Sequence, residues 1–432
     1  MRSPYRKCPN SPTKASPCVF PLLNPITSLK VLRRLRILQV FSRYLQKGGE
    51  ENSVYRIGDT LQQDHDVEYF FGSTQDLMND DLVSRMMSPF RVFANLPVRE
   101  RLIKYQELGQ FDCWLIHNVL PGLSPIVYST AFSLGIPVVH YLHNYRMGCI
   151  NGFFLNHGQP CERCLKGNFW PAFQTACWHD SHLISGWMGL VTRQIHHLDV
   201  FSKVSGWVAL SQAQRLKHVE MGIPASRIHV LPHFYEAKEA PPPARLDGNI
   251  LFLGRLSPEK GVDQLLRAWK LVTNHGRRLV IAGEGPESEK LKALAKSLKL
   301  ENVDFIGFVD RNAQREIWSQ TAFSVIPSIW SEPFPLTFLE SWGQGRTFVA
   351  NRLGAMAEVV KEGEDGLLAE PFSAPSLATQ IQRFLDSPET YVRMGNAGHL
   401  RILNEFNKTE WLTGINRIFQ KIMPEDLFLS SR

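Results

Sequence analysis

The sequence predicts an α/β protein of two doubly wound domains that face each other across a cleft. Short apolar runs alternate with helix-length segments, which is typical of parallel sheets covered by helices on both faces. The alternation occurs twice, before and after a proline-rich stretch. The length of 432 residues and the 44% hydrophobic composition allow two cores, because single cores seldom grow beyond about 250 to 300 residues.

Residues 1–34 are expected to be a disordered or basic N-terminal tail. They are rich in Ser, Pro and basic side chains, a composition that buries little and that transit peptides share. Residues 1–49 hold ten Lys or Arg and no acid, so removing them takes the formal charge of the chain from +7 to −3. The folded part is therefore not basic, which argues against a nucleic-acid partner.

The first domain is expected over residues 35–236. Its strands are predicted at `RILQVF`, `VEYFF`, `DCWLIHNV`, `IPVVHYLH`, `GWVAL` and `RIHVLP`. A glycine loop at Gly48 and Gly49 follows the first strand and precedes helical apolar spacing. A later helix is predicted in `SPIVYSTAFSLG`, with Ser124 as N-cap and Pro125 at the first helical position.

Residues 237–248 contain three successive prolines, which favour an extended linker over a packed element. After this linker the alternation restarts, and a second domain is expected over residues 249–405 with strands at `NILFLGRL`, `RLVIAGEG`, `NVDFIGFV` and `FSVIPS`. Residues 406–432 are expected to form a C-terminal helix that packs back on the first domain. Ligands of open parallel sheets bind beyond the carboxyl ends of the strands, so the cleft is the expected site.

Two cations follow the first strand of the second domain. In `GRLSPEKG`, Arg255 and Lys260 lie between Gly254 and Gly261. A planar Arg fork and a Lys point charge suit a diphosphate whose charge grows as it departs. The alternative is a surface turn in which Arg255 or Lys260 pairs with Glu259.

Two glutamates stand eight positions apart in `SEPFPLTFLES`. Pro is tolerated in a first helical turn, so a helix is expected to begin near Pro335, with Glu332 in the preceding loop and Glu340 inside the helix. Free N–H groups at this start, including those of Leu336 and Thr337, can bind an anion, and the carboxylates can accept hydrogen bonds from sugar hydroxyls. The alternative role of the two glutamates is helix capping.

Four motifs follow one another in the second domain: `GRLSPEKG`, `AGEGP` at Gly283, `FIGFV` and the E-x7-E of `EPFPLTFLE`. In the order and spacing of these motifs, the chain resembles the retaining glycosyltransferase family 4 over most of residues 35–425. The resemblance implies the GT-B fold, in which a Rossmann-like N-terminal acceptor domain faces a Rossmann-like donor domain. It implies a nucleotide-diphosphate sugar as co-substrate and a saccharide or lipid-linked saccharide as acceptor, as in surface polysaccharide assembly. It also implies retention of anomeric configuration and no catalytic metal.

The resemblance also assigns roles to residues. Arg255 and Lys260 would bind the donor diphosphate, Glu332 the transferred sugar, and Glu340 the ribose hydroxyls. In the first domain, Gly48 and Gly49 match the family's glycine loop, and His143 matches a histidine beside the sugar, with His140 less well aligned. Two departures from the family pattern are Pro335, which removes one N–H from the anion-binding turn, and the single Gly354 in `LGAMAEVV`.

An insertion at residues 149–177 contains four cysteines: Cys149, Cys161, Cys164 and Cys177. Their C-x11-C-x2-C-x12-C spacing predicts a structural zinc site, in which His157 or His179 could replace a ligand. The insertion resembles that of a Cys-rich subset of the family. Disulfides, a redox pair or reduced cysteines packed as small apolar groups are the alternatives.

The sequence is compatible with a free protein and with one that contacts a membrane surface. No apolar stretch reaches the roughly 18 residues that a membrane span needs, so a cytoplasmic protein is expected, either free or at the inner face of the plasma membrane. The basic residues Lys30, Arg33, Arg34 and Arg36 could contact anionic lipid or be solvated. The segment `HLISGWMGLVTRQIHHLDVFSKV` fits either an acceptor- or membrane-facing helix or a core helix.

The leading hypothesis is therefore a sugar transferase. The alternative is a catalytically silent relative that binds a nucleotide sugar or saccharide as a scaffold. A phosphorylase or an epimerase on the same fold is a further option, but no lysine is identifiable as the Schiff-base residue of a cofactor-bearing phosphorylase.

Overall fold

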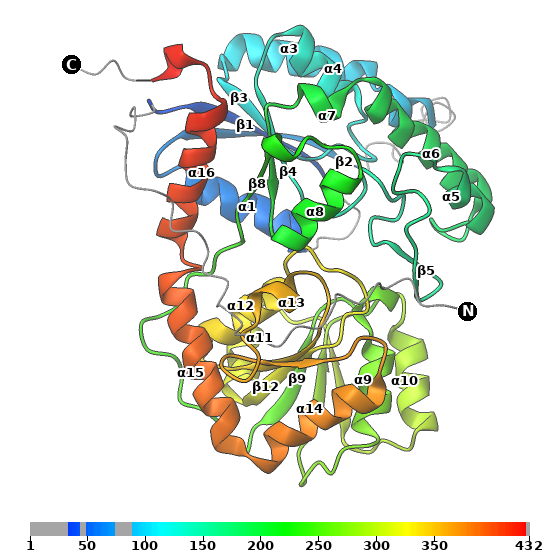
Figure 1. The fold of residues 1–432 in the computed structure, drawn as a ribbon, viewed down its shortest axis with the longest axis vertical. Helices are drawn as coiled ribbons and strands as arrows, with labels where there is room; N and C mark the ends of the chain where they lie inside the picture. Colours follow the sequence, from blue (N-terminus) through cyan, green and yellow to red (C-terminus); the bar gives the residue numbers. More distant parts are fainter. Residues whose placement is uncertain (1–32, 44–48, 74–88, 429–432) are drawn as a thin grey trace, which may run out of the picture.

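The computed structural model describes residues 33–43, 49–73 and 89–428. Two lobes, each built on a six-stranded parallel sheet, lie one above the other (Figure 1). The predicted α/β fold class, two doubly wound GT-B domains, is thereby confirmed. Gly48 and Lys30, both named above, lie outside the described residues.

The sheet of the N-terminal lobe has the strand order β2-β1-β3-β4-β7-β8. The four central strands, β1, β3, β4 and β7, are almost fully buried, because helices cover the sheet and parallel sheets need both faces covered. The strands are β1 (Arg36–Arg43), β2 (Asp66–Ser73), β3 (Cys113–Asn118), β4 (Val138–Tyr141), β7 (Gly206–Ala209) and β8 (Ile228–Val230). The helices are α1 (Gly49–Leu61), α3 (Leu96–Gly109), α4 (Ile126–Ser133), α5 (Trp170–Thr175), α6 (His182–His197), α7 (Val200–Lys203) and α8 (Gln212–Glu220).

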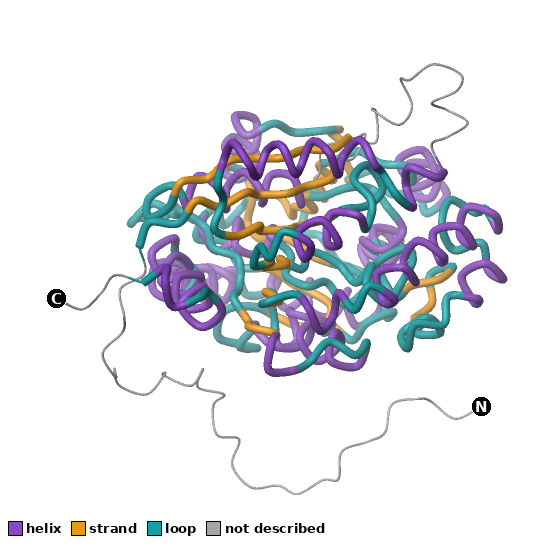
Figure 2. Tube along the Cα trace, turned by 90° about the horizontal axis from the view of Figure 1, so that it is seen from above, coloured by secondary structure: helices purple, strands orange, loops and turns teal. Residues whose placement is uncertain are grey.

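The sheet of the C-terminal lobe has the order β11-β10-β9-β12-β13-β14. Its strands are β9 (Asn249–Leu253), β10 (Leu279–Ala282), β11 (Val303–Gly307), β12 (Thr321–Ile326), β13 (Phe348–Asn351) and β14 (Leu367–Ala369). Its helices are α9 (Val262–Trp269), α10 (Ser288–Ser297), α11 (Arg311–Ser319), α12 (Leu336–Gly343), α13 (Gly354–Val359), α14 (Ala374–Asp386) and α15 (Pro388–Asn404). Figure 2, viewed from above, shows the strands enclosed by helices.

Each sheet reverses its strand order at one point, between β1 and β3 in the first lobe and between β9 and β12 in the second. Ligands of doubly wound sheets bind at such a switch point, beyond the carboxyl ends of the strands. In the C-terminal lobe, the loops after β9 and β12 carry the two cations and Glu332. The topology therefore places the predicted donor residues at the switch point.

The last long helix, α16 (Lys408–Ile422), leaves the C-terminal lobe and runs along the N-terminal one (Figure 1). Asn416 of α16 hydrogen-bonds the His65 ring at 2.8 Å. The indole N–H of Trp411 donates to the hydroxyl of Tyr141 in β4 at 3.3 Å. The chain thus crosses between the lobes twice, once at residues 237–248 and once before α16.

Two local predictions are wrong. Pro125 is the N-cap of α4, not its first helical residue, and Ser124 precedes it with a φ of +72°. The Ser124 hydroxyl still accepts the backbone N–H of Ile126 at the start of α4 at 3.4 Å, and it also accepts that of Asn95 at 3.0 Å, which a local capping pattern does not foresee.

The basic cluster near the chain start is paired with acids of the N-terminal lobe. Arg33 contacts Asp112 at 2.6 Å, Arg34 contacts Asp66 at 2.7 Å and Arg36 contacts Glu68 at 3.5 Å. These contacts tie Arg33 and Arg34 to the lobe rather than leaving them in a disordered tail. The three arginine side chains keep 39%, 51% and 42% of their surface exposed, so contact with anionic lipid stays a prediction.

Candidate functional site at the crevice between the lobes

Two loops of the C-terminal lobe are joined closely where the predicted donor residues lie. Gly261 has a φ of +66°, and a Cβ built on it would lie 2.2 Å from the carbonyl oxygen of Pro327. The backbone N–H of Ile329 donates to the carbonyl of Glu259 at 3.0 Å. Only glycine permits this approach at this φ, so the loop after β9 lies directly against the loop after β12.

This junction brings Lys260 and Glu332 together across 72 residues of sequence. Lys260 Nζ lies 2.7 Å from Glu332 Oε1, and the Ser328 hydroxyl donates to the same oxygen. Glu332 is buried, whereas the Lys260 side chain is 26% exposed. A buried carboxylate needs such partners, and the exposed side of the ammonium group can still meet a ligand.

Arg255 is more open, with 56% of its side chain exposed. Its guanidinium contacts Glu259 at 2.7 Å, so the ion pair of the alternative interpretation is present. Burial alone would raise the pKa of Glu259, but the charge of Arg255 and hydrogen bonds from Ser257 and Arg255 outweigh it and lower that pKa. Arg255 has five N–H donors, so the pair with Glu259 leaves capacity for an anion.

Helix α12 begins beside these loops. Its N-cap is Pro335, whose side chain makes no cap hydrogen bond, and Thr337 Oγ1 donates to the carbonyl of Leu253 at the end of β9 at 3.3 Å. A helix start with uncapped N–H groups attracts negative charge. From the other lobe, a Cβ built on Gly49 would lie 4.0 Å from the Leu336 side chain. The start of α12 therefore faces the N-terminal lobe, with Glu340 one turn further along the helix.

Close backbone packing explains two further glycines. Gly283 has a φ of +142°, and a Cβ there would lie 1.9 Å from the carbonyl oxygen of Gly254. Gly354 has a φ of +53°, and a Cβ there would lie 2.5 Å from the carbonyl oxygen of Glu332. Ala355 donates its N–H to that same carbonyl at 3.1 Å. Gly354 thus lies against the Glu332 loop, although the second glycine expected from the resemblance is absent.

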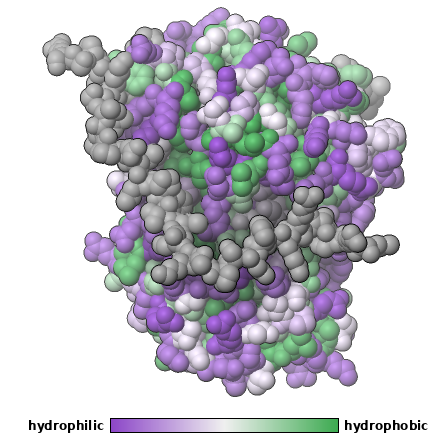
Figure 3. Space-filling view, viewed as in Figure 1, coloured by the Kyte–Doolittle hydropathy of each residue, from purple (hydrophilic) through white to green (hydrophobic). Residues whose placement is uncertain are grey.

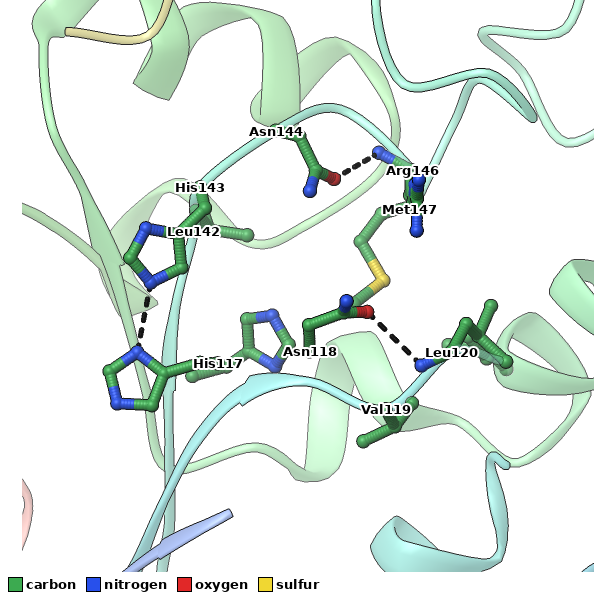
Figure 4. Close-up of a pocket in the computed structure, with 11 residues that line it drawn as sticks. His117, Asn118, Val119, Leu120, Leu142, His143, Asn144, Arg146 and Met147 are labelled. Atoms are coloured by element: carbon green, nitrogen blue, oxygen red, sulfur yellow. Dashed lines mark hydrogen bonds between the residues drawn. The ribbon is translucent and has the colours of Figure 1, made fainter. Parts of the chain in front are cut away.

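The N-terminal lobe contributes a group of histidines. His143 follows β4, and its Nε2 lies 2.9 Å from Nδ1 of His117 in β3 (Figure 4). Burial, and then the charge of Arg56, lowers the pKa of His143 to about 3. His143 is therefore neutral at physiological pH. His140, the less aligned candidate, is buried in β4 and bonds the Tyr128 hydroxyl at 3.0 Å.

Aromatic contacts bring the histidine group up to the C-terminal lobe. The His233 ring lies 6.1 Å from the rings of both His143 and Phe334, which follows Glu332 by two positions. Tyr145 meets Trp330 edge-on, with ring centroids 6.2 Å apart. His143 and the Glu332 loop thus lie where the two lobes face each other.

Sequence reasoning missed His117, His233 and Gln39. His117 ends a predicted strand, `DCWLIHNV`, and His233 follows `RIHVLP`, so both stand where strand ends meet the crevice. The position of each at a carboxyl strand end is a signal that could have found them. Gln39 lies in the middle of β1, and its role comes only from the pairing of β1 with β3.

The structure does not support the predicted zinc site. Within the described ranges, no three or more His, Cys, Asp or Glu side chains form a group that could hold a metal ion. Cys149, Cys161, Cys164 and Cys177 are free thiols. Cys149 bonds Asn151 at 3.1 Å, and burial, then the charges of the other three thiols, raises the pKa of Cys164 to about 12. Cys149 and Cys164 are buried, which fits the alternative of small apolar groups, whereas Cys161 and Cys177 are partly exposed.

Family models match both lobes. Residues 47–239 match the model described as Glycosyltransferase Family 4, and residues 237–401 match the model described as Glycosyl transferases group 1. The chain contains two glycosyltransferase domains. Their boundary near residue 237 coincides with the Pro-rich linker between the two sheets.

Curated relatives share part of their length with this chain. Glycogen synthase of Mycobacterium tuberculosis is 28% identical over 53% of the chain and 57% of that protein. Alpha-D-kanosaminyltransferase of Streptomyces kanamyceticus is 31% identical over 40% of the chain and 48% of that protein. LpsD, a lipopolysaccharide core biosynthesis glycosyltransferase of Rhizobium meliloti, is 30% identical over 49% of the chain and 62% of that protein. The matches span less than two thirds of each relative.

Solved structures agree with the GT-B fold over most of the chain. Sucrose-phosphate synthase from Thermosynechococcus elongatus is similar with a TM-score of 0.67 at 18% identity, over 90% of this chain and 99% of that one. Anabaena HepE, solved with UDP and glucose, is similar with a TM-score of 0.62 at 17% identity, over 89% of this chain and 99% of that one. At these identities the likeness establishes the architecture of the two glycosyltransferase domains.

Proposed function

We propose that the protein transfers a sugar, with retention of configuration, from a nucleotide-diphosphate sugar to a saccharide or lipid-linked saccharide acceptor. The observation that carries the proposal is the Lys260–Glu332 pair at 2.7 Å, set against the uncapped start of α12 at the sheet's switch point. This arrangement offers positive charge for a diphosphate and a carboxylate for sugar hydroxyls at adjacent positions.

In this proposal the diphosphate lies between the loop after β9 and the start of α12. Arg255 and Lys260 contact its oxygens together with the N–H groups of Leu336 and Thr337, while Gly254 and Gly283 let the backbone approach closely. Glu332 binds hydroxyls of the transferred sugar, and Glu340 binds the ribose. As the nucleoside diphosphate leaves, its growing negative charge meets preorganised donors, which lowers the barrier to bond cleavage.

The N-terminal lobe would hold the acceptor, with His143 and Gly49 on its side of the crevice. The acceptor class is proposed from the relatives, because LpsD is named for lipopolysaccharide core biosynthesis and glycogen synthase for a polysaccharide. HepE was solved with UDP-glucose, which makes UDP-sugars the first donors to test.

Donor binding can be screened by thermal shift with UDP-, GDP-, ADP- and TDP-sugars on wild type, Lys260→Ala and Lys290→Ala. Lys290 on α10 is an exposed lysine of the same lobe, paired with Glu287. We expect one donor class to stabilise wild type and Lys290→Ala and not Lys260→Ala. Equal stabilisation of all three proteins would contradict the proposed site.

Turnover measurements distinguish an active transferase from a catalytically silent scaffold. With the donor found in the screen, wild type should release free nucleoside diphosphate, and a candidate acceptor such as a glucan should accelerate that release. The anomeric configuration of the product, read by NMR, tests retention. Donor binding without turnover on any acceptor would favour the catalytically silent scaffold instead.

Contact with a membrane surface is a second part of the proposal. No helix among the described residues has the length and apolarity to cross a bilayer. On the face drawn in Figure 3, hydrophilic residues predominate and hydrophobic ones form small groups. Trp170 on α5 and Leu183 on α6 are 60% and 79% exposed and lie on helices packed against each other.

We expect these two side chains to enter the lipid surface at the inner face of the membrane, near a lipid-linked acceptor. Wild type should co-sediment with phosphatidylglycerol vesicles, and Trp170→Ser with Leu183→Ser should reduce that binding several-fold. Leu271→Ser, which removes a 61% exposed leucine from the other lobe, is the matched control. Unchanged binding of the double variant would contradict this contact.

A further inference from the structure

We propose that Gln39 and His117 are positioning residues that hold His143 in the tautomer with an unprotonated Nδ1, which then accepts a hydrogen bond from a saccharide hydroxyl. The inference rests on the function proposed above and specifies that His143 is the acceptor in its hydrogen bond with the saccharide. Neither Gln39 nor His117 belongs to the donor site already described.

The three side chains come from neighbouring strands of the N-terminal sheet. Gln39 lies in β1, His117 near the end of β3, and His143 after β4, and these strands are adjacent in the order β1-β3-β4. His117 Nε2 lies 2.7 Å from Gln39 Oε1, and His117 Nδ1 lies 2.9 Å from His143 Nε2. Gln39 and His117 are 0% and 2% exposed, so water cannot replace either partner easily.

The direction of each hydrogen bond follows from the chemistry of Gln39. An amide oxygen only accepts, so His117 Nε2 must carry the proton that is donated to it. A neutral imidazole has one N–H, and His117 Nδ1 is therefore an acceptor. His143 Nε2 must then donate to His117, which leaves Nδ1 of His143 with a free lone pair.

We call the hydrogen-bonded chain Gln39–His117–His143 the relay. Both of its imidazole rings are neutral at physiological pH. Burial, followed by the charges of nearby histidines, lowers the pKa of His117 well below its usual range. Burial also lowers the pKa of His143 to about 3. A neutral relay inside a low-dielectric lobe has strong hydrogen bonds, because little water competes for them.

The unprotonated nitrogen lies on the edge of the His143 ring away from His117 (Figure 4). From that edge it can accept the O–H of a sugar, which orients that hydroxyl and leaves its oxygen lone pairs directed elsewhere. The opposite tautomer could only donate to the hydroxyl oxygen. The relay therefore selects how a saccharide hydroxyl is oriented beside the reacting sugar.

The direct test is a ¹⁵N NMR spectrum of the full chain with ¹⁵N-labelled histidine, in which the His143→Gln variant assigns the His143 signals. We expect a protonated-type shift at Nε2 and an unprotonated-type shift at Nδ1 without any ligand. Gln39→Leu should yield a mixture of tautomers, and Gln39→Glu, which keeps the acceptor, should preserve the single tautomer. A protonated Nδ1 in wild type would overturn the proposal.

Kinetics test whether the tautomer matters. His117→Leu should lower kcat about tenfold or more with little change in the donor KM, whereas His117→Asn, whose amide oxygen can replace Nδ1 as acceptor, should stay within about threefold of wild type. The control is His65→Leu, because His65 is also buried and bonded at both ring nitrogens but lies at the opposite, amino-terminal ends of the strands. Equal loss in His117→Asn and His117→Leu would overturn the positioning role.

These readouts keep the two proposals separate. The NMR result needs no donor, so a single His143 tautomer in a protein that binds no nucleotide sugar would contradict the proposed function alone. A protein that turns over sugar with unchanged kcat in Gln39→Leu and His117→Leu would contradict the relay alone.

Discussion

At the scale of single residues, the site depends on charges that are paired in the free protein and can be shared with a ligand. Glu332 is buried and meets Lys260 and the Ser328 hydroxyl, so its charge is compensated before any sugar arrives. Lys260 keeps part of its surface open, and Arg255 more than half. In the proposed function these cations are already oriented, so less free energy would be spent on ordering them when a diphosphate binds.

The neutral histidines lead to a prediction about stability and pH. The pKa of His143 falls to about 3 in the folded protein, mainly through burial, whereas in the unfolded chain it is about 6.5. Below pH 6.5 the unfolded chain therefore binds a proton that the folded one does not, so stability falls as pH falls. We expect His143→Gln to lose less stability than wild type between pH 7 and pH 5, by up to about 2 kcal/mol. Urea denaturation at both pH values checks this, and equal losses would contradict it.

At the scale of elements, two loops and a helix start are held in register by backbone contacts. Gly261 lies against Pro327, Ile329 bonds the carbonyl of Glu259, and Thr337 bonds the carbonyl of Leu253. The ends of β9 and β12 and the start of α12 therefore behave as one rigid unit. Lys260 and Glu332 meet because these three elements meet.

Gly261→Ala tests the close approach of the loops. The new Cβ would lie 2.2 Å from the Pro327 carbonyl at a φ of +66°, so we expect a loss of at least about 2 kcal/mol from strain and clash together. Gly276→Ala is the control, since Gly276 also has a positive φ, +77°, but its Cβ would have no atom within 4 Å. Denaturant midpoints should fall more for Gly261→Ala. Equal midpoints for the two variants would show that the loops do not pack this tightly.

What the sequence predicts at this scale follows from local patterns. The strands, the linker and the helix after Pro335 could be foreseen, because apolar periodicity and proline positions are local signals. The pairing of Lys260 with Glu332 was not foreseen, although both residues were named. The Gln39–His117–His143 contacts and the free thiols of the cysteine insertion depend on tertiary packing, which no spacing rule reports.

At the scale of the whole molecule, a carboxylate of the C-terminal lobe caps a helix of the N-terminal lobe. Both carboxylate oxygens of Glu358 on α13 accept backbone N–H groups at the start of α8 in the other lobe, from Gln212 at 3.0 Å and from Ala213 at 2.9 Å. A carboxylate at a helix N-terminus is favourable because it meets both free N–H groups and the helix dipole. This contact joins the lobes together with α16 and with the ring contacts of Trp330 and Phe334.

We expect Glu358→Gln to weaken the contact between the lobes by about 0.5 to 2 kcal/mol, since the neutral amide loses the dipole interaction and one acceptor. In solution scattering without ligand, the variant should have a larger radius of gyration than wild type. Glu364→Gln, an exposed residue of the same lobe, is the control. An unchanged radius for Glu358→Gln would show that this cap does not hold the lobes together.

The central claim is that Lys260 binds the β-phosphate of a nucleoside diphosphate at the start of α12. Calorimetric titration of wild type, Lys260→Ala and Lys290→Ala with UDP and UMP, or with the di- and monophosphates of whichever base binds, tests it most directly. A charge-assisted hydrogen bond contributes about 1.5 to 3 kcal/mol, so wild type and Lys290→Ala should prefer the diphosphate about 10- to 100-fold, and Lys260→Ala should lose most of that preference. The same preference in all three proteins would contradict the account.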